Sequence, residues 1–157
     1  MMRSIVAFAT DADGDWMARL DCGHNQHVRH NPPFTNRPWV TSEEGRAGKL
    51  GQQLDCVRCD AFELPGAASA YKRTDEFTDD SIPAALRRDH TTKTGVWAKI
   101  VVLEGRLRYR VAAIGTDVVL TPDGDPGIVV PELPHHVEPL GRVRFFVEFY
   151  RVDDASG

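Results

Sequence analysis

The stretch Leu54-Asp55-Cys56-Val57-Arg58-Cys59 places two cysteines two residues apart, and it decides how the first part of the chain folds. The third cysteine of the chain, Cys22, is followed two residues later by His24. An odd number of cysteines cannot all form disulfides within one chain. Zinc prefers thiolate and imidazole ligands in tetrahedral geometry, and closely spaced ligand pairs let two tight turns hold it. We therefore predict a Zn²⁺ site formed by Cys22, His24, Cys56 and Cys59.

Two further histidines, His27 and His30, compete with His24 for the fourth position. We favour His24 because a Cys-Gly-His turn brings both side chains to one point, and His27 is the alternative. Four protein ligands close the coordination shell, which is typical of a structural metal ion. About sixty residues bury little apolar surface, so such a small unit is expected to need a metal or a disulfide for stability.

The composition excludes several classes of protein. Apolar residues make up 41% of the 157 residues and charged residues 27%, which is typical of a folded globular chain. The formal net charge of -4 argues against a general nucleic-acid binder or a protein of anionic membranes. There is no apolar run of about eighteen residues and no signal-peptide core. We therefore expect a cytoplasmic protein without a nucleic-acid or membrane partner.

A break in the pattern divides the chain into two domains, 1–64 and 65–157. The stretch 64–70 contains proline, glycine and small residues without any periodicity, and every cysteine precedes it. The first domain is expected to be α+β. It has two β-compatible runs, 4–10 and 16–20, and then a short helix capped by Thr41 or Ser42 and ended by Gly51.

The second domain reads as all-β. The expected strands are separated by Pro-, Gly- and Asp-rich turns, and one of these turns is placed at Glu104-Gly105. The expected strands cover residues 96–103, 107–112, 118–120, 127–130 and 142–152. Many short strands at this spacing indicate a closed or double-sheet architecture.

Both domains resemble known families. Residues 3–62 resemble an uncharacterised bacterial domain family without an established activity. The motif residues are Asp15-Trp16, Cys22-Gly23-His24, Gln26-His27-Val28-Arg29-His30-Asn31-Pro32-Pro33, Arg37-Pro38-Trp39-Val40 and Leu54-Asp55-Cys56 with Cys59.

Residues 71–152 resemble a cupin-like, tellurite-resistance-related family that occurs alone or attached to a methyltransferase. The resemblance rests on Gly95-Val96-Trp97, Val102-Leu103-Glu104-Gly105, Pro134-His135-His136-Val137 and Phe146-Val147-Glu148-Phe149, among other positions. It implies an all-β cupin-like barrel, a double-stranded β-helix, whose lumen holds a metal or a small ligand.

The residues of this barrel suggest a second metal site. His135 and His136 are adjacent, so on a strand only one of them can face the lumen. The spacing from Pro131 matches the second cupin motif and favours His136. Glu148 lies on a strand with apolar residues on both faces, so its carboxylate needs a partner.

Together with His90, which precedes the strand led by Trp97, His136 and Glu148 would form a two-histidine, one-carboxylate set for Zn or Fe. The alternative is a Glu148 paired with Arg or Lys, beside ordinary surface histidines. The sequence departs from ordinary cupins because Thr91-Thr92-Lys93-Thr94 replaces their first His-x-His motif.

Three functions remain open. The first is a metal-binding stress-response protein, related to tellurite resistance, whose barrel binds a small ligand or oxyanion. Arg106, Arg108 and Arg110 are possible anion contacts, although a solvated strand face is the more ordinary role for such residues. The second is a metal-dependent, oxygenase-like cupin enzyme, and the third is a non-catalytic zinc-stabilised adapter. A homodimer formed through the barrel is possible in each case.

Overall fold

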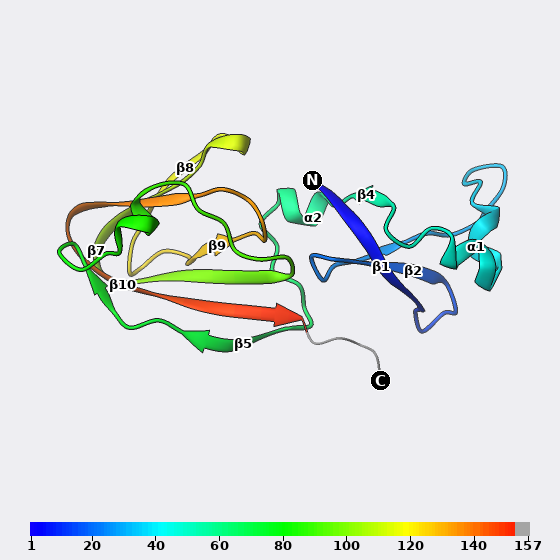
Figure 1. Ribbon diagram of the computed structural model, residues 1–157, viewed down its shortest axis with the longest axis horizontal. Coiled ribbons are helices and arrows are strands. Elements are labelled where there is room, and N and C mark those ends of the chain that lie inside the picture. The colour runs from blue at the N-terminus through cyan, green and yellow to red at the C-terminus, as the bar shows by residue number, and fades with distance from the viewer. Residues whose placement is uncertain (153–157) are drawn as a thin grey trace. The chain divides into compact units, whose positions relative to one another are not determined.

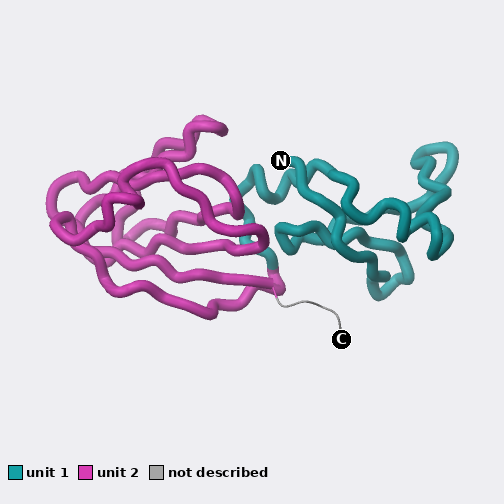
Figure 2. Tube along the Cα trace, in the orientation of Figure 1, with its two compact units in different colours: residues 1–65 teal, residues 66–157 magenta. Residues whose placement is uncertain are grey.

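The computed structural model describes residues 1–152 (Figure 1). The chain divides into two compact units, Met1–Pro65 (unit 1) and Gly66–Gly157 (unit 2), which Figure 2 shows in different colours. Within the described range, no helix is both long enough and apolar enough to cross a membrane.

Unit 1 is a small antiparallel sheet with short helical segments. The strands are β1 (Met2–Thr10), β2 (Trp16–Leu20), β3 (Asn25–His27) and β4 (Gln53–Asp55), in the order β3-β2-β1-β4. The helical segments are η1 (Pro38–Thr41), α1 (Glu43–Ala47) and α2 (Val57–Asp60). Its buried apolar side chains are few and mostly of medium size, namely Ile5, Ala18, Leu20, Val28 and Val40 besides the cysteines.

Local hydrogen bonds explain where the elements of unit 1 turn and begin. The β1–β2 turn is held by the Asp11 carboxylate, whose Oδ1 accepts from the backbone N–H groups of Asp13 and Asp15. The Ser42 hydroxyl accepts from the N–H of Gly45 and caps α1. The helix ends at Ala47, earlier than the glycine that was expected to end it.

Unit 2 is built on two long paired strands. Its elements are β5 (Ala68–Arg73), β6 (Phe77–Thr78), η2 (Ala84–Arg87), β7 (Val96–Val111), η3 (Ala112–Ile114), β8 (Thr116–Leu120), β9 (Gly127–Val129) and β10 (His136–Val152). The strands form one six-stranded sheet with the path β5-β10-β7-β8, where β6 pairs with β10 and β9 with β7. Every strand pair is antiparallel, and β7 and β10 pair along nearly their whole length.

The predicted turn at Glu104-Gly105 is wrong, because β7 continues through it. Gly105 has a φ of 78°, and a Cβ atom there would lie 1.9 Å from the carbonyl oxygen of Arg142. A glycine at this position lets β7 bend closely past β10 instead of reversing, so the expected two strands are one.

The predicted cupin-like barrel, a double-stranded β-helix, is wrong as well. Strands of 16 and 17 residues dominate unit 2, where the prediction required many short strands closed on themselves. Large apolar side chains such as Trp97, Leu107 and Phe145 are fully buried in this unit. Unit 2 therefore has a substantial apolar core of its own.

Candidate metal centre and ligand pocket

Unit 1 brings Cys22, His24, Cys56 and Cys59 together in one buried cluster. One ligand atom from each residue lies within 4.8 Å of the ligand atoms of the other three. His24 Nδ1 is 3.4 Å from the Sγ atoms of Cys22 and Cys56 and 3.7 Å from that of Cys59. Three sulfur atoms and one nitrogen at this spacing surround a point at which a metal ion such as zinc could bind.

Two short segments deliver the four side chains. Cys22 and His24 lie in the turn between β2 and β3, and Gly23 between them has a φ of 94°. The turn is closed by hydrogen bonds from Gly23 N to Leu20 O and from Leu20 N to His24 O, both 2.9 Å. Cys56 is the N-cap of α2 and Cys59 lies within that helix, so their spacing places both sulfur atoms on one side of a single helical turn.

A hydrogen bond orients the imidazole of His24. Its Nε2 is 2.7 Å from the carbonyl oxygen of Glu63, and because a carbonyl can only accept, Nε2 carries the proton. The lone pair of the neutral ring is then on Nδ1, which faces the three sulfur atoms. A ligating histidine that donates its other N–H to a backbone carbonyl is a common arrangement in protein metal sites.

The cluster is also suited to hold negative charge. The pKa of the Cys59 thiol is lowered to about 4, because its thiolate accepts a hydrogen bond from Cys22 and lies near the Arg3 guanidinium. The pKa of Cys22 is raised, because its thiol donates that hydrogen bond and is buried. Burial also raises the pKa of Cys56. A divalent cation would compensate all three thiolates at once and remove these protons.

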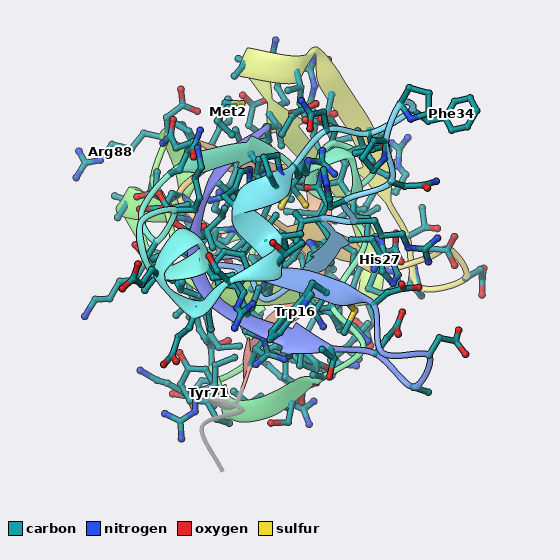
Figure 3. All side chains as sticks on the ribbon, turned by 90° about the vertical axis from the view of Figure 1, so that its right-hand side faces the viewer. Met2, Trp16, His27, Phe34, Tyr71 and Arg88 are labelled. Carbon is teal, nitrogen blue, oxygen red and sulfur yellow. The ribbon has the colours of Figure 1, made fainter. Side chains whose placement is uncertain are left out.

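The alternative ligand, His27, lies outside the cluster. Its side chain is exposed at the surface of unit 1 (Figure 3), and its Nε2 is 2.8 Å from Oδ2 of Asp11. His30 holds its own loop, because its Nδ1 accepts a hydrogen bond from the backbone N–H of Arg37. The structure therefore selects His24 among the three histidines of this region.

The second predicted site, formed by His90, His136 and Glu148, is not assembled. Between residues 1 and 152, the only group of three or more potential ligands is the cluster in unit 1. His136 Nδ1 is 2.7 Å from Oδ1 of Asp89 and its Nε2 is 3.4 Å from Oε1 of Glu138, so two carboxylates, and neither His90 nor Glu148, are the neighbours of this ring. A metal at this place in unit 2 is not supported.

The partner of Glu148 also differs from the prediction, which required a metal or a cation. Its carboxylate accepts a hydrogen bond from the Tyr150 hydroxyl on the same face of β10. Because successive side chains of a strand alternate, Glu148 and His136 lie on the face of β10 opposite to the pocket described next.

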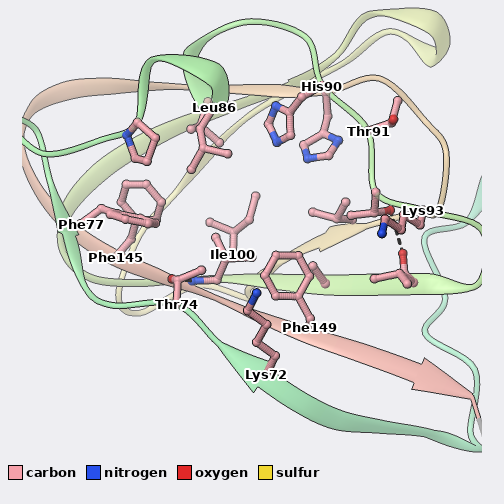
Figure 4. Close-up of a pocket in the computed structure, with 18 of the residues that line it drawn as sticks. Lys72, Thr74, Phe77, Leu86, His90, Thr91, Lys93, Ile100, Phe145 and Phe149 are labelled. Atoms are coloured by element: carbon pink, nitrogen blue, oxygen red, sulfur yellow. Dashed lines mark hydrogen bonds between the residues drawn. The ribbon is translucent and has the colours of Figure 1, made fainter.

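Unit 2 contains a pocket of about 460 Å³ on one face of its sheet. Odd-numbered residues of β10, such as Val137, Phe145 and Phe149, line it, together with residues of β5, β7 and the segment around η2 (Figure 4). His135 belongs to this wall and is only 4% exposed, so the prediction that His136 faces inward is wrong. The polar groups of the wall include His90, His135, two lysines, several threonines and the hydroxyl of Tyr71.

The three arginines considered as anion contacts do not line the pocket. Arg108 forms ion pairs with Asp117 and Glu138, and Arg110 pairs with Asp117. They therefore belong to a charged, solvated strand face.

Fold and sites thus define a protein with a small unit that has a buried cluster of potential metal ligands and a larger β-sheet unit that has a ligand-sized pocket. Residues 6–63 match a family described as "Protein of unknown function (DUF3565)", and residues 72–147 match a family described as "TehB-like domain". The resemblance to a tellurite-resistance-related family is confirmed as this TehB-like match, whereas its cupin-like character is not.

Curated relatives match this chain over only part of their length. In two strains of Haemophilus influenzae, the probable S-adenosyl-L-methionine-dependent methyltransferase TehB is 34% identical to this chain over 74 residues. The match covers 45% of this chain and 26% of the relative. The chain therefore spans about a quarter of the length of these relatives.

Solved structures point in the same direction and overturn the cupin assignment. The crystal structure of TehB from Haemophilus influenzae is similar with a TM-score of 0.51 and 28% identity, over 55% of this chain and 32% of that one. A crystal structure of a protein from E. coli strain K12 has a TM-score of 0.53 at 19% identity, over 59% of this chain and 89% of that one. The latter likeness concerns the fold alone.

Proposed function

We propose that this protein is a zinc-stabilised, small-molecule-binding protein with a role related to tellurite resistance. Unit 1 is stabilised by a zinc ion, and unit 2 binds an organic ligand in its pocket. The pocket of unit 2 is the observation that carries this proposal.

The size and chemistry of the pocket support ligand binding. Its volume of about 460 Å³ lies within the range of small-molecule sites, roughly 300–1,000 Å³. Apolar side chains such as Ile100, Phe145 and Phe149 form most of the wall. A few polar groups at defined positions among apolar side chains are the usual means by which a protein orients a small ligand.

The same wall argues for an organic ligand, because a bare oxyanion such as tellurite would leave most of the apolar wall uncovered. Transferring a charged group into apolar surroundings is costly unless it is paired and hydrogen-bonded. Arg108 and Arg110 are engaged with carboxylates outside the pocket, so pairing for the anionic group of an organic ligand would come from the two lysines of the wall. The link to tellurite would then be indirect, through an organic molecule.

Zinc is the ion that best suits unit 1. Three thiolates and one imidazole form a donor set typical of structural zinc, and four protein ligands leave no open position for a substrate. The proposed metal therefore stabilises the fold of unit 1, while binding of the small molecule belongs to unit 2.

The relatives support a role for this protein in connection with methyl transfer. TehB of Haemophilus influenzae is named a probable methyltransferase, and this chain matches about a quarter of it. We propose that the matched part binds a small molecule that takes part in such chemistry, without itself carrying out the transfer.

Binding of 1-anilinonaphthalene-8-sulfonate, a dye with an apolar body and one anionic group, tests the proposed function on the full chain. We expect saturable binding that is lost when the pocket is filled by Ala98→Phe or Val96→Phe, because both residues line it. Ala113→Phe adds the same ring at the exposed η3 and is the matched control. Unchanged binding by folded Val96→Phe and Ala98→Phe variants would refute the proposal.

A further inference from the structure

Two imidazoles lie side by side in the wall of the pocket of unit 2. His90 and His135 form an antiparallel bridge, in which each backbone N–H donates to the other's carbonyl at 3.0 Å. Their ring centroids are 4.2 Å apart, and both residues line the pocket (Figure 4). The backbone bridge therefore keeps His90 and His135 side by side, whether or not a ligand is bound.

The same hydrogen-bond pattern assigns the tautomer of each ring. His90 Nδ1 is 3.1 Å from the carbonyl oxygen of Arg88, and His135 Nδ1 is 3.0 Å from that of Leu133. A carbonyl oxygen only accepts, so both Nδ1 atoms carry the proton, and in a neutral ring Nε2 is then an acceptor. Across residues 1–152, neither Nε2 atom has a hydrogen-bond partner.

The surroundings keep the buried ring neutral. Burial lowers the pKa of His135 to about 4, and the neighbouring His90 acts in the same direction. Tyr109, whose ring lies 6.0 Å from that of His135, donates its hydroxyl proton to the carbonyl of Ile128 and so is not available to the imidazole. A ligand that approaches the pair meets two hydrogen-bond acceptors.

A cation lies across the pocket from this pair. Lys72 of β5 extends its ammonium group toward the pocket from the side away from His90, and apolar side chains such as Ile100 lie between them (Figure 4). In the part of the chain that the structure describes, no carboxylate is paired with Lys72. Lys93, the second lysine of the wall, is likewise without an ion pair there.

We infer that the ligand of unit 2 is a small amphipathic molecule with a hydroxyl or amine donor at one end, bound by His90 and His135, and an anionic group at the other, bound by Lys72. The inference rests on the proposed function and specifies its ligand. The apolar wall between the two ends selects a hydrocarbon-like body.

Octanoate and ω-hydroxyoctanoate test this inference, because they share the anionic group and the apolar body and differ in one terminal hydroxyl. Titration calorimetry on the full chain should show ω-hydroxyoctanoate binding about three- to tenfold more tightly, the effect of one additional buried hydrogen bond. The double variant His90→Phe, His135→Phe should abolish this preference without weakening octanoate, and each single variant should reduce it by less, because either Nε2 atom can accept the one hydroxyl proton. His90→Phe keeps the test open if the more buried His135→Phe fails to fold.

Two further variants are controls. His136→Phe changes the adjacent histidine, which lies outside the pocket and pairs with Asp89, and should keep the preference. Lys72→Gln should weaken both acids equally and leave their ratio unchanged.

Equal affinities for the two acids in the unsubstituted protein would overturn the inference while the proposed function stands. The same holds if neither acid binds but 1-anilinonaphthalene-8-sulfonate does. Failure of all three probes would overturn the inference and the proposed function together.

Discussion

Units 1 and 2 solve the problem of stability in different ways. The longest strand of unit 1 has nine residues, and four potential metal ligands occupy its centre. Unit 2 pairs strands of 16 and 17 residues and buries side chains as large as Trp97 and Phe145. We propose that the small unit needs an ion to stay folded and that four protein ligands close its site. The large unit buries enough apolar surface to be stable without an ion, even though one face of its sheet carries an open pocket.

Removing ligands from unit 1 should have the largest effect. With Cys56→Ser and Cys59→Ser combined, we expect unit 1 to lose its metal and its ordered structure, since structural zinc contributes on the order of 10 kcal/mol in small domains. Metal content per chain and backbone NMR spectra check this. Val57→Ser, between the two cysteines and exposed, should keep both. Stoichiometric zinc in the double variant would show that these cysteines are not ligands.

A cavity in the core should affect unit 2 alone. Phe145 is fully buried and its ring lies 5.6 Å from that of Phe77, so Phe145→Ala should destabilise unit 2 by about 3–5 kcal/mol. Chemical denaturation measures the loss, and the metal of unit 1 should remain bound. Phe34→Ala removes the same ring from an 87% exposed position in unit 1 (Figure 3) and should change stability by less than about 0.5 kcal/mol. Similar losses of stability in Phe145→Ala and Phe34→Ala would contradict the claim that unit 2 is stabilised by its apolar core.

Acid should weaken unit 2 through its buried histidine. The pKa of His135 lies near 4 when folded and near its ordinary value of about 6.5 when unfolded, so below that value the unfolded state binds more protons. The contribution is fully present above about pH 6.5. It is lost as the pH falls toward 4, by about 3 kcal/mol in all. Between these pH values, the free energy of unfolding of unit 2 should therefore fall more steeply with decreasing pH in the unsubstituted protein than in His135→Phe. Identical slopes in the two proteins would show that His135 is not the source of this pH dependence.

The smallest effect concerns the N-cap of α1. The Ser42 hydroxyl accepts from the N–H of Gly45 at 3.0 Å, so Ser42→Ala should lower the stability of unit 1 by about 1 kcal/mol. The metal-bound protein should show this loss in thermal unfolding, whereas Ser42→Asp should restore most of it. A loss comparable to that of the cysteine variant would mean that α1, and not the cluster, dominates the stability of unit 1.

The metal-ligating cluster could be predicted because its information is local. Ligand types are few, and the spacings of Cys22 to His24 and of Cys56 to Cys59 each correspond to one tight turn. Bringing the two turns together requires only a short sheet. The hydrogen bond from His24 to Glu63, which orients the ring, could not be foreseen because it joins residues distant in the sequence.

The pocket was mispredicted for an identifiable reason. Adjacency correctly allows only one of His135 and His136 to face inward, but the spacing of a cupin motif selected the wrong one. Strand alternation contained the better signal, because His135 shares its parity with Val137, Val147 and Phe149, all of which line the pocket. The pairing of His135 with His90 depends on tertiary contact and leaves no local pattern.

The long strand was missed because glycine is ambiguous. Glu104-Gly105 has the composition of a turn, but the positive φ of Gly105 here allows a close approach to Arg142. Only the partner strand distinguishes a bend from a reversal. Splitting β7 in two then made unit 2 resemble an architecture of short strands.

Hydrogen exchange of the full chain, followed by mass spectrometry with and without a zinc chelator, tests the central claim most directly. We predict that the chelator abolishes the protection of backbone amides in β1, β2 and α2 of unit 1 and leaves that of β7 and β10 in unit 2 unchanged. Protection of unit 1 that survives complete removal of the metal would contradict the account, and so would loss of protection in both units at once.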